Sequence, residues 1–244
     1  MGKCDSRQEK GWRSSLTRLL IGVVAWSLAA GAVSEVHADS TVNQDFRLWA
    51  PIYLTVPLST SFIGYMEVNP RFGDDVSQLD QLLLRPAIGY KLTDHVSLWQ
   101  GYAWIGNYQP SFREENRLFQ QLIYEQTFPF VKVFSRSRLE ERFMEHTDGT
   151  ALRARTMLRG DVPLLQIPDW AFVVYDEIFV NLNTVGNGPE SGFDQNRLFL
   201  GMNHQFTKYF NMDFGYQMQA LNNRQSGLIN QINNIILLQF FINL

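Results

Sequence analysis

The sequence predicts an all-β protein: a closed antiparallel up-and-down transmembrane β-barrel of about twelve strands, with ten strands as the next choice. Three observations lead to this fold class. Apolar and polar residues alternate with a period of two along most of the chain. The alternating segments are mostly longer than ten residues, whereas strands of soluble proteins usually have about five or six. The connections between them alternate between tight turns and longer polar loops, as in outer-membrane barrels.

The composition requires a folded protein and excludes one class of partner. The chain has 244 residues, of which 45% are hydrophobic, 14% aromatic and 18% charged, so it is too apolar and too weakly charged to be disordered. The formal net charge of −3 provides no overall positive field for phosphate backbones. We therefore expect no nucleic-acid partner.

The first 38 residues have the features of a secretory signal peptide. A basic segment precedes an uncharged apolar run at 19–33, and residues 36–38 form a small-x-small cleavage site. A retained N-terminal anchor is the alternative, but the apolar run is shorter than the roughly 20 residues of a membrane helix. We expect cleavage near Ala38, which leaves 39–244 as the barrel and removes Cys4, the only cysteine. Disulfides are then excluded.

Eleven segments carry the strand pattern. In residues 81–92, for example, Leu82, Leu84 and Ile88 share one face, whereas Arg85 and Lys91 share the other. The predicted strands are 44–56, 60–72, 81–92, 95–108, 115–128, 130–146, 149–162, 169–183, 195–207, 210–221 and 229–243. Because single-chain bacterial barrels have even strand numbers, we expect a twelfth strand, either from residues 39–43 or from one segment that contains two elements.

The lengths of the connections predict the orientation of the barrel. Tight turns are expected at 57–59, 93–94, 129 and 207–208. Longer loops rich in Gly, Asn, Asp and Ser are expected at 73–79, 107–114, 145–149, 184–194 and 222–228, and only 161–169 breaks the alternation. Short turns face the periplasm in bacterial outer-membrane barrels. From this pattern we expect the chain to lie in the outer membrane of a Gram-negative envelope.

Arginines gather on one parity of neighbouring predicted strands. If the apolar face meets lipid, the other face lines the interior and carries a charge network. The predicted lumen residues are Arg117, Glu125, Arg136, Arg138, Glu140, Arg142, Arg153, Arg155, Arg159, Glu177 and Arg197. Two interpretations remain open: a satisfied salt-bridge network that fills the barrel, or a partly hydrated pore that favours small anionic solutes.

Two further observations concern residues outside this set. Trp49, Trp99 and Trp170 lie near predicted strand ends, so we expect them in the headgroup layer. Asp176 falls on the lipid-facing parity of its strand, and the sequence offers no account of it.

No motif for catalysis or cofactor binding is recognisable. His95, His146 and His204 are isolated, without the spacing of a zinc site, and hydrolase or nucleotide-binding loops are absent. We expect a protein that is not an enzyme and has no cofactor or metal. One alternative is an outer-membrane lipid-modifying hydrolase with a Ser/His pair, for which His146 is the candidate base. Another is a periplasmic lipocalin-like binder, which needs an apolar interior and a polar exterior.

Four runs, at 115–121, 135–143, 175–183 and 193–197, resemble the uncharacterised family called domain of unknown function 2490. The resemblance covers about 44–244 and implies an outer-membrane-like β-barrel, with no catalytic or binding residues to transfer. The function we expect is a narrow or plugged pore or a structural envelope component. Its partners would be outer-membrane lipids and the barrel-assembly machinery.

Overall fold

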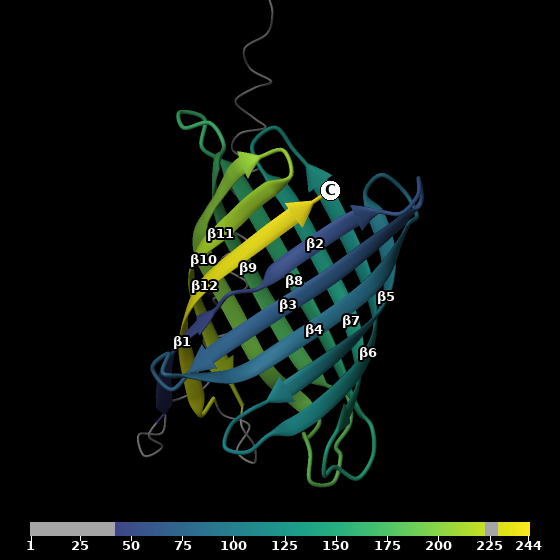
Figure 1. Cartoon of the computed structure of the whole chain (residues 1–244), viewed down its shortest axis with the longest axis vertical. Coiled ribbons are helices and arrows are strands. Elements are labelled where there is room, and N and C mark those ends of the chain that lie inside the picture. Colours follow the sequence, from purple (N-terminus) through teal and green to yellow (C-terminus); the bar gives the residue numbers. More distant parts are fainter. Residues whose placement is uncertain (1–41, 223–228) are drawn as a thin grey trace, which may run out of the picture. The chain divides into compact units, whose positions relative to one another are not determined.

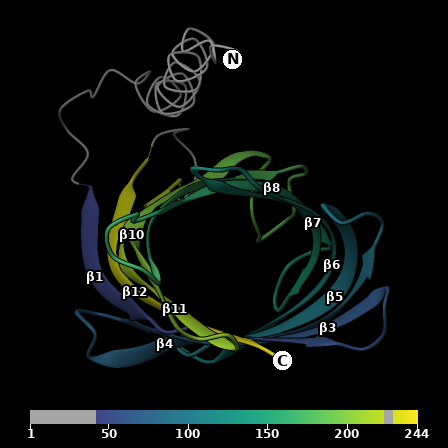
Figure 2. The ribbon, with the colours of Figure 1, turned by 90° about the horizontal axis from the view of Figure 1, so that it is seen from above.

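The computed structural model describes residues 42–222 and 229–244, so the predicted signal peptide at 1–38 lies outside the described residues. The described chain forms twelve β-strands that close into a barrel (Figures 1 and 2). The strands are β1 (Asn43–Trp49), β2 (Ile52–Pro57), β3 (Phe62–Gly73), β4 (Gln78–Lys91), β5 (Val96–Asn107), β6 (Arg113–Thr127), β7 (Lys132–Met144), β8 (Ala151–Pro163), β9 (Trp170–Asn181), β10 (Gly192–Thr207), β11 (Phe210–Leu221) and β12 (Gln231–Asn243). No helix in these ranges is long and apolar enough to cross a membrane.

Each strand from β2 to β12 pairs antiparallel with its neighbours along the chain, which confirms the up-and-down barrel. Because successive strands reverse direction, the connections alternate between the two ends of the barrel: 58–61, 92–95, 128–131, 164–169 and 208–209 lie at one end, and the connections that include the longest loops lie at the other (Figure 1). The connection at 164–169 is the exception to the short turns of the first end. We call the two ends the short-turn end and the long-loop end.

The strands β1 and β2 occupy a single position in the ring, between β12 and β3. β2 continues the register of β1 against β12, and it also continues the register of β1 against β3. The interruption between the two strands falls at Ala50 and Pro51, where Pro51 has no N–H to donate and Pro70 on β3 has none either. Hydrogen bonds still bridge the gap, from Ala50 N to Pro70 O at 3.1 Å and from Phe240 N to Pro51 O at 2.9 Å. The twelve strands therefore occupy eleven positions around the ring, and we call each position a stave.

An odd number of staves makes the closing seam parallel. The first and last staves of an up-and-down ring run in opposite directions when their number is even and in the same direction when it is odd. β1 accordingly pairs parallel with β12 from Asn43 and Gln231 onward, and β2 continues beside β12 in the same sense (Figure 1). The all-β barrel is thus confirmed, but its sheet is mixed at the seam rather than antiparallel throughout.

The outer face of the barrel wall carries apolar side chains and the inner face carries charged ones. A soluble protein has the opposite arrangement, with an apolar core and a polar surface. Ile88, Tyr90 and Leu92 are 44–49% exposed on the outside, whereas Glu140 and Arg153 are 1% and 4% exposed on the inside. Contacts between strands that are not neighbours establish which face is internal: Arg159 of β8 pairs with Asp213 of β11. The exterior is apolar and the interior is polar and charged.

Aromatic and aliphatic side chains also lie on the inner face of the barrel. Trp49 is 4% exposed and belongs to a luminal cluster with Tyr175 and Phe199. The prediction that Trp49 lies in the headgroup layer is wrong, because its position in β1 has the inward parity. The ring of Phe119 covers Gly101 on the neighbouring strand so closely that an added Cβ would lie 2.1 Å from it. Glycine at this position lets a large ring lie flat on the inner wall.

Polar side chains that face outward near the middle of strands are paired with one another. Asp176 of β9, unexplained by the sequence, accepts hydrogen bonds from Asn196 Nδ2 of β10 on both carboxylate oxygens at 3.0 Å. Ser137 and Thr156 share a hydrogen bond of 3.2 Å in the same way. Each outward polar group of these pairs has its partner on the adjacent strand.

Candidate functional site

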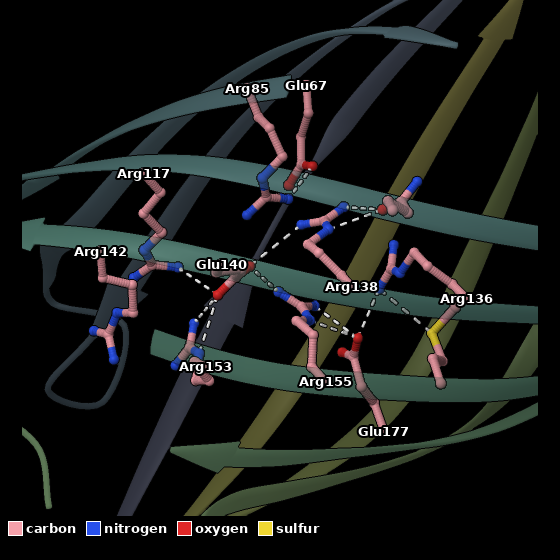
Figure 3. Close-up of polar contacts among 12 residues, drawn as sticks. Glu67, Arg85, Arg117, Arg136, Arg138, Glu140, Arg142, Arg153, Arg155 and Glu177 are labelled. Carbon is pink, nitrogen blue, oxygen red and sulfur yellow. Dashed lines mark hydrogen bonds and ion pairs between the residues drawn. The ribbon is translucent and has the colours of Figure 1, made fainter. Parts of the chain in front are cut away.

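Glu140, on β7, is the centre of the charged interior. Its carboxylate lies within 4 Å of four arginines: Arg153 at 2.6 Å, Arg155 at 3.2 Å, Arg138 at 3.5 Å and Arg117 at 3.7 Å. These side chains come from β6, β7 and β8, where alternate residues of neighbouring strands point into the lumen (Figure 3). The period-two placement of Arg and Glu in the sequence therefore becomes one cluster in space.

Two further carboxylates extend the cluster. Glu177 on β9 accepts hydrogen bonds from Arg136 and Arg155, both at 2.8 Å. Glu115 on β6 is 2.6 Å from Arg142 and 2.6 Å from Arg117. We call the connected set the luminal charge network; its members are Glu115, Arg117, Arg136, Arg138, Glu140, Arg142, Arg153, Arg155 and Glu177.

The network is almost completely removed from solvent. Glu140 is 1% exposed, Glu177 3% and Arg138 4%. Buried ions need both charge partners and hydrogen bonds to offset the loss of hydration, and here each carboxylate has at least two guanidinium neighbours. Aromatic faces add support, because the guanidinium carbons of Arg138 and Arg155 lie 4.2 and 4.4 Å from ring centroids. The network residues are thus packed against one another and against aromatic rings on the inner face of β6–β9.

Three of the predicted lumen residues lie apart from this network. Glu125 has a side chain that is 47% exposed, and it pairs with Lys132 at 3.6 Å. It is exposed because it lies near the short-turn end of β6, away from the buried network. The prediction that it joins the network is wrong. Arg159 forms a separate group with Asp161 at 2.6 Å and with Asp213. Arg197 has no carboxylate within 4 Å among the described residues.

Sequence reasoning missed Glu115 as a luminal carboxylate, although it lies two residues before Arg117 on the same strand face. It also missed Asp194, which lies 2.9 Å from Arg153. For Glu115 the available signal was parity on the same strand, because residues i and i+2 share a face. Parity gives no such signal for Asp194, because the register of β10 against β9 shifts between Phe193 and Gln195.

The three histidines of the described part of the chain have separate surroundings. His95 Nδ1 lies 3.1 Å from the carbonyl oxygen of Glu125, and His204 stacks on Trp170 with ring centroids 4.4 Å apart. His146 is a loop residue with a positive φ of 62°. Within 42–222 and 229–244, no group of three His, Cys, Asp or Glu side chains is placed to hold a metal ion.

A cavity of about 340 Å³ lies beside the network in the long-loop half of the lumen. Its walls are strongly basic and carry few carboxylates. The charged side chains that line it are Arg47, Arg71, Asp80, Arg85, Glu115, Arg117, Arg142, Arg153, Arg155, Asp194 and Arg197.

The fold and this network define a class: a β-barrel with a buried, arginine-rich interior and an apolar exterior. Within it, the chain belongs to the DUF2490 family of proteins of unknown function, whose family model matches residues 46–230. It is also 35% identical over 233 residues to an uncharacterized protein of Methylorubrum extorquens, across 93% of this chain and 97% of that protein. The resemblance suggested by the four sequence runs is confirmed.

Proposed function

We propose that this protein is an outer-membrane β-barrel that is plugged at mid-height by its luminal charge network, and that it acts in the envelope as a closed or very narrow pore rather than as an enzyme. The observation that carries the proposal is the polarity of the wall, with leucine, isoleucine and aromatic side chains outside and paired arginines inside. Exposure of such an apolar surface to water costs free energy, whereas contact with lipid acyl chains does not.

The closed ring of hydrogen bonds supports the same location. A polypeptide can span hydrocarbon only if its backbone groups are satisfied internally, and a barrel without free edges satisfies them. The parallel seam leaves no open edge between the first and last staves. The partners implied by this location are outer-membrane lipids and the barrel-assembly machinery, reached after removal of a signal peptide near Ala38.

The network supports a plugged state. Arg138, Glu140 and Arg155 are 1–6% exposed and hold one another at 2.6 to 3.5 Å together with their neighbours. An arginine-rich lumen favours small anionic solutes over cations wherever it admits solute at all.

The location is tested by fractionation and gel migration. A folded membrane barrel extracted in detergent should migrate differently before and after boiling, and it should be recovered with outer membranes. Recovery as a water-soluble periplasmic protein with no heat-dependent shift would contradict the proposal.

The plug is tested by planar-bilayer conductance. We expect the wild type to be nearly silent, and Arg138→Gln with Arg155→Gln to open a measurable conductance, because both side chains shorten and lose their ion pairs. Glu125→Gln is the control, since its side chain lies outside the network. A large steady wild-type current would show that the lumen is open.

A further inference from the structure

Two luminal arginines differ from all the others in having no ionic partner. Arg71 on β3 and Arg197 on β10 have no carboxylate oxygen within 4.0 Å in the described part of the chain. The other luminal arginines all have one; they are Arg47, Arg85, Arg117, Arg136, Arg138, Arg142, Arg153, Arg155 and Arg159. Two positive charges therefore remain uncompensated in the interior.

The ring of Trp49 lies beside both of these guanidinium groups, and Arg197 also lies 4.6 Å from the ring centroid of Phe179. The guanidinium carbon of Arg71 lies 3.9 Å from the centroid of Trp49, and that of Arg197 lies 5.0 Å from it. Trp49 is only 4% exposed, so its ring is packed inside the barrel. The three residues come from β3, β10 and β1, which are not consecutive in sequence. The barrel closure brings them together.

Neutral carboxamides, rather than carboxylates, orient the pair. Arg71 Nη1 donates to Gln81 Oε1 at 2.7 Å, and Arg197 Nε donates to Gln195 Oε1 at 3.2 Å. Hydrogen bonds of this kind fix direction without cancelling charge. Both arginines retain donors beyond those that these bonds use.

The surroundings of the pair are strongly basic, because eight arginines and three carboxylates are among the residues that line the cavity. Both arginines and Trp49 line the cavity of about 340 Å³ in the long-loop half of the lumen. Trp49 Nε1 and Arg71 Nε are buried and have no hydrogen-bond acceptor among the described residues. Native interiors seldom leave such groups unmatched, and a bound anion would supply an acceptor to these N–H groups and a negative charge to two arginines that have no ion pair.

We propose that Arg71 and Arg197, mounted on Trp49, form a binding site for a small oxyanion, a carboxylate or phosphate group, inside the barrel. Guanidinium forks match the two oxygens of a carboxylate or phosphate. A cavity of about 340 Å³ is at the small end of ligand sites, so the ligand is a small solute or a single headgroup. The proposal deepens the preference of the lumen for anions, but it requires neither a membrane location nor an open pore.

The test is calorimetric titration of the purified barrel, refolded in an uncharged detergent. Inorganic phosphate and succinate are titrated separately, and sodium chloride at matched ionic strength measures non-specific screening. We expect saturable binding of at least one oxyanion: phosphate alone identifies a phosphate site, succinate alone a carboxylate site, and both a general oxyanion site.

The variant Arg71→Gln with Arg197→Gln should weaken this binding by about tenfold or more, because charge-assisted hydrogen bonds are lost. Arg113→Gln is the matched control and should bind as the wild type does, since Arg113 is an exposed arginine that does not line this cavity. The single variants Arg71→Gln and Arg197→Gln, expected to be intermediate, keep the test valid if the double variant does not refold.

Absence of saturable binding of both oxyanions to the wild type would overturn the proposal, as would equal affinity in the wild type and in the arginine variants. Neither result would bear on the membrane location or the plug, because those are measured by fractionation and conductance. A barrel that is silent in bilayers can still bind the anion, so the two proposals fail separately.

Discussion

At the scale of single residues, the interior is organised by carboxylates that each serve several arginines. Glu140 is the extreme case, with four guanidinium groups within 4 Å and 1% exposure. Removal of one partner from a buried ionic group leaves charges that neither water nor protein compensates. A glutamine at this position would keep the shape and two polar atoms but remove the negative charge.

We therefore expect Glu140→Gln to lower the free energy of unfolding by about 3–5 kcal/mol. Glu125→Gln makes the same chemical change at an exposed ion pair, where about 1 kcal/mol or less is expected. Denaturant unfolding of the barrel refolded in detergent or lipid measures both. Equal losses in the two variants would show that the four arginines do not depend on Glu140.

At the scale of strands, cross-strand pairs decide what each face tolerates. The outward pair of Asp176 and Asn196 is held by two hydrogen bonds of 3.0 Å. Asn196→Leu should destabilise the barrel by about 1–3 kcal/mol, because it leaves Asp176 unsatisfied on an apolar surface. Asp176→Leu with Asn196→Leu removes both polar groups and should recover most of that loss.

The measurement is a double-mutant cycle of unfolding free energies. A double variant less stable than Asn196→Leu alone would contradict the pairing and would indicate that Asp176 has another role on the outer face.

Glycines under aromatic rings govern the packing of neighbouring strands on the inner face. Gly101→Ala should cost about 1–3 kcal/mol, because the new Cβ would meet the Phe119 ring at 2.1 Å. Gly160→Ala is the control, since the nearest atom to its Cβ lies 3.7 Å away. Thermal unfolding of the two variants should separate them, and identical unfolding temperatures would show that the ring moves freely.

At the scale of the whole molecule, the parallel seam makes a prediction about which residues can be joined. Ile52 of β2 is the register partner of Phe240 of β12. Cysteines at both positions should form a disulfide on oxidation, because register partners on adjacent strands lie within bonding range. Cysteines at 52 and Ile236, four residues away along β12, are the control pair.

The cross-link is read as a change in migration on a non-reducing gel. Efficient bonding of the control pair with none between 52 and 240 would show that the seam has another register. The native chain has only Cys4 as a thiol, so no other cysteine in the barrel interferes.

The alternation of side chains allowed much of this architecture to be predicted. A period of two assigns each residue to one of two faces without knowledge of the strands beside it. The apolar exterior at Ile88 and the charged interior at Arg153 could therefore be predicted from the sequence. Glu125 was misplaced because parity tells the face but not the height, and its position near the strand end leaves it exposed. Trp49 was misplaced because its nearness to a strand end was given more weight than its parity.

The sequence by itself determined that the chain is a barrel of long strands and which side chains share a face, because these are local properties of a strand. Only the tertiary structure decided the number of staves, the direction of the seam and the partner of each arginine. Those depend on how the ring closes, and closure joins residues separated by most of the chain: Asn43 meets Gln231, and Trp49 meets Arg197. No local sequence pattern predicts that Arg71 and Arg197 lie beside Trp49 without a carboxylate as an ion-pair partner.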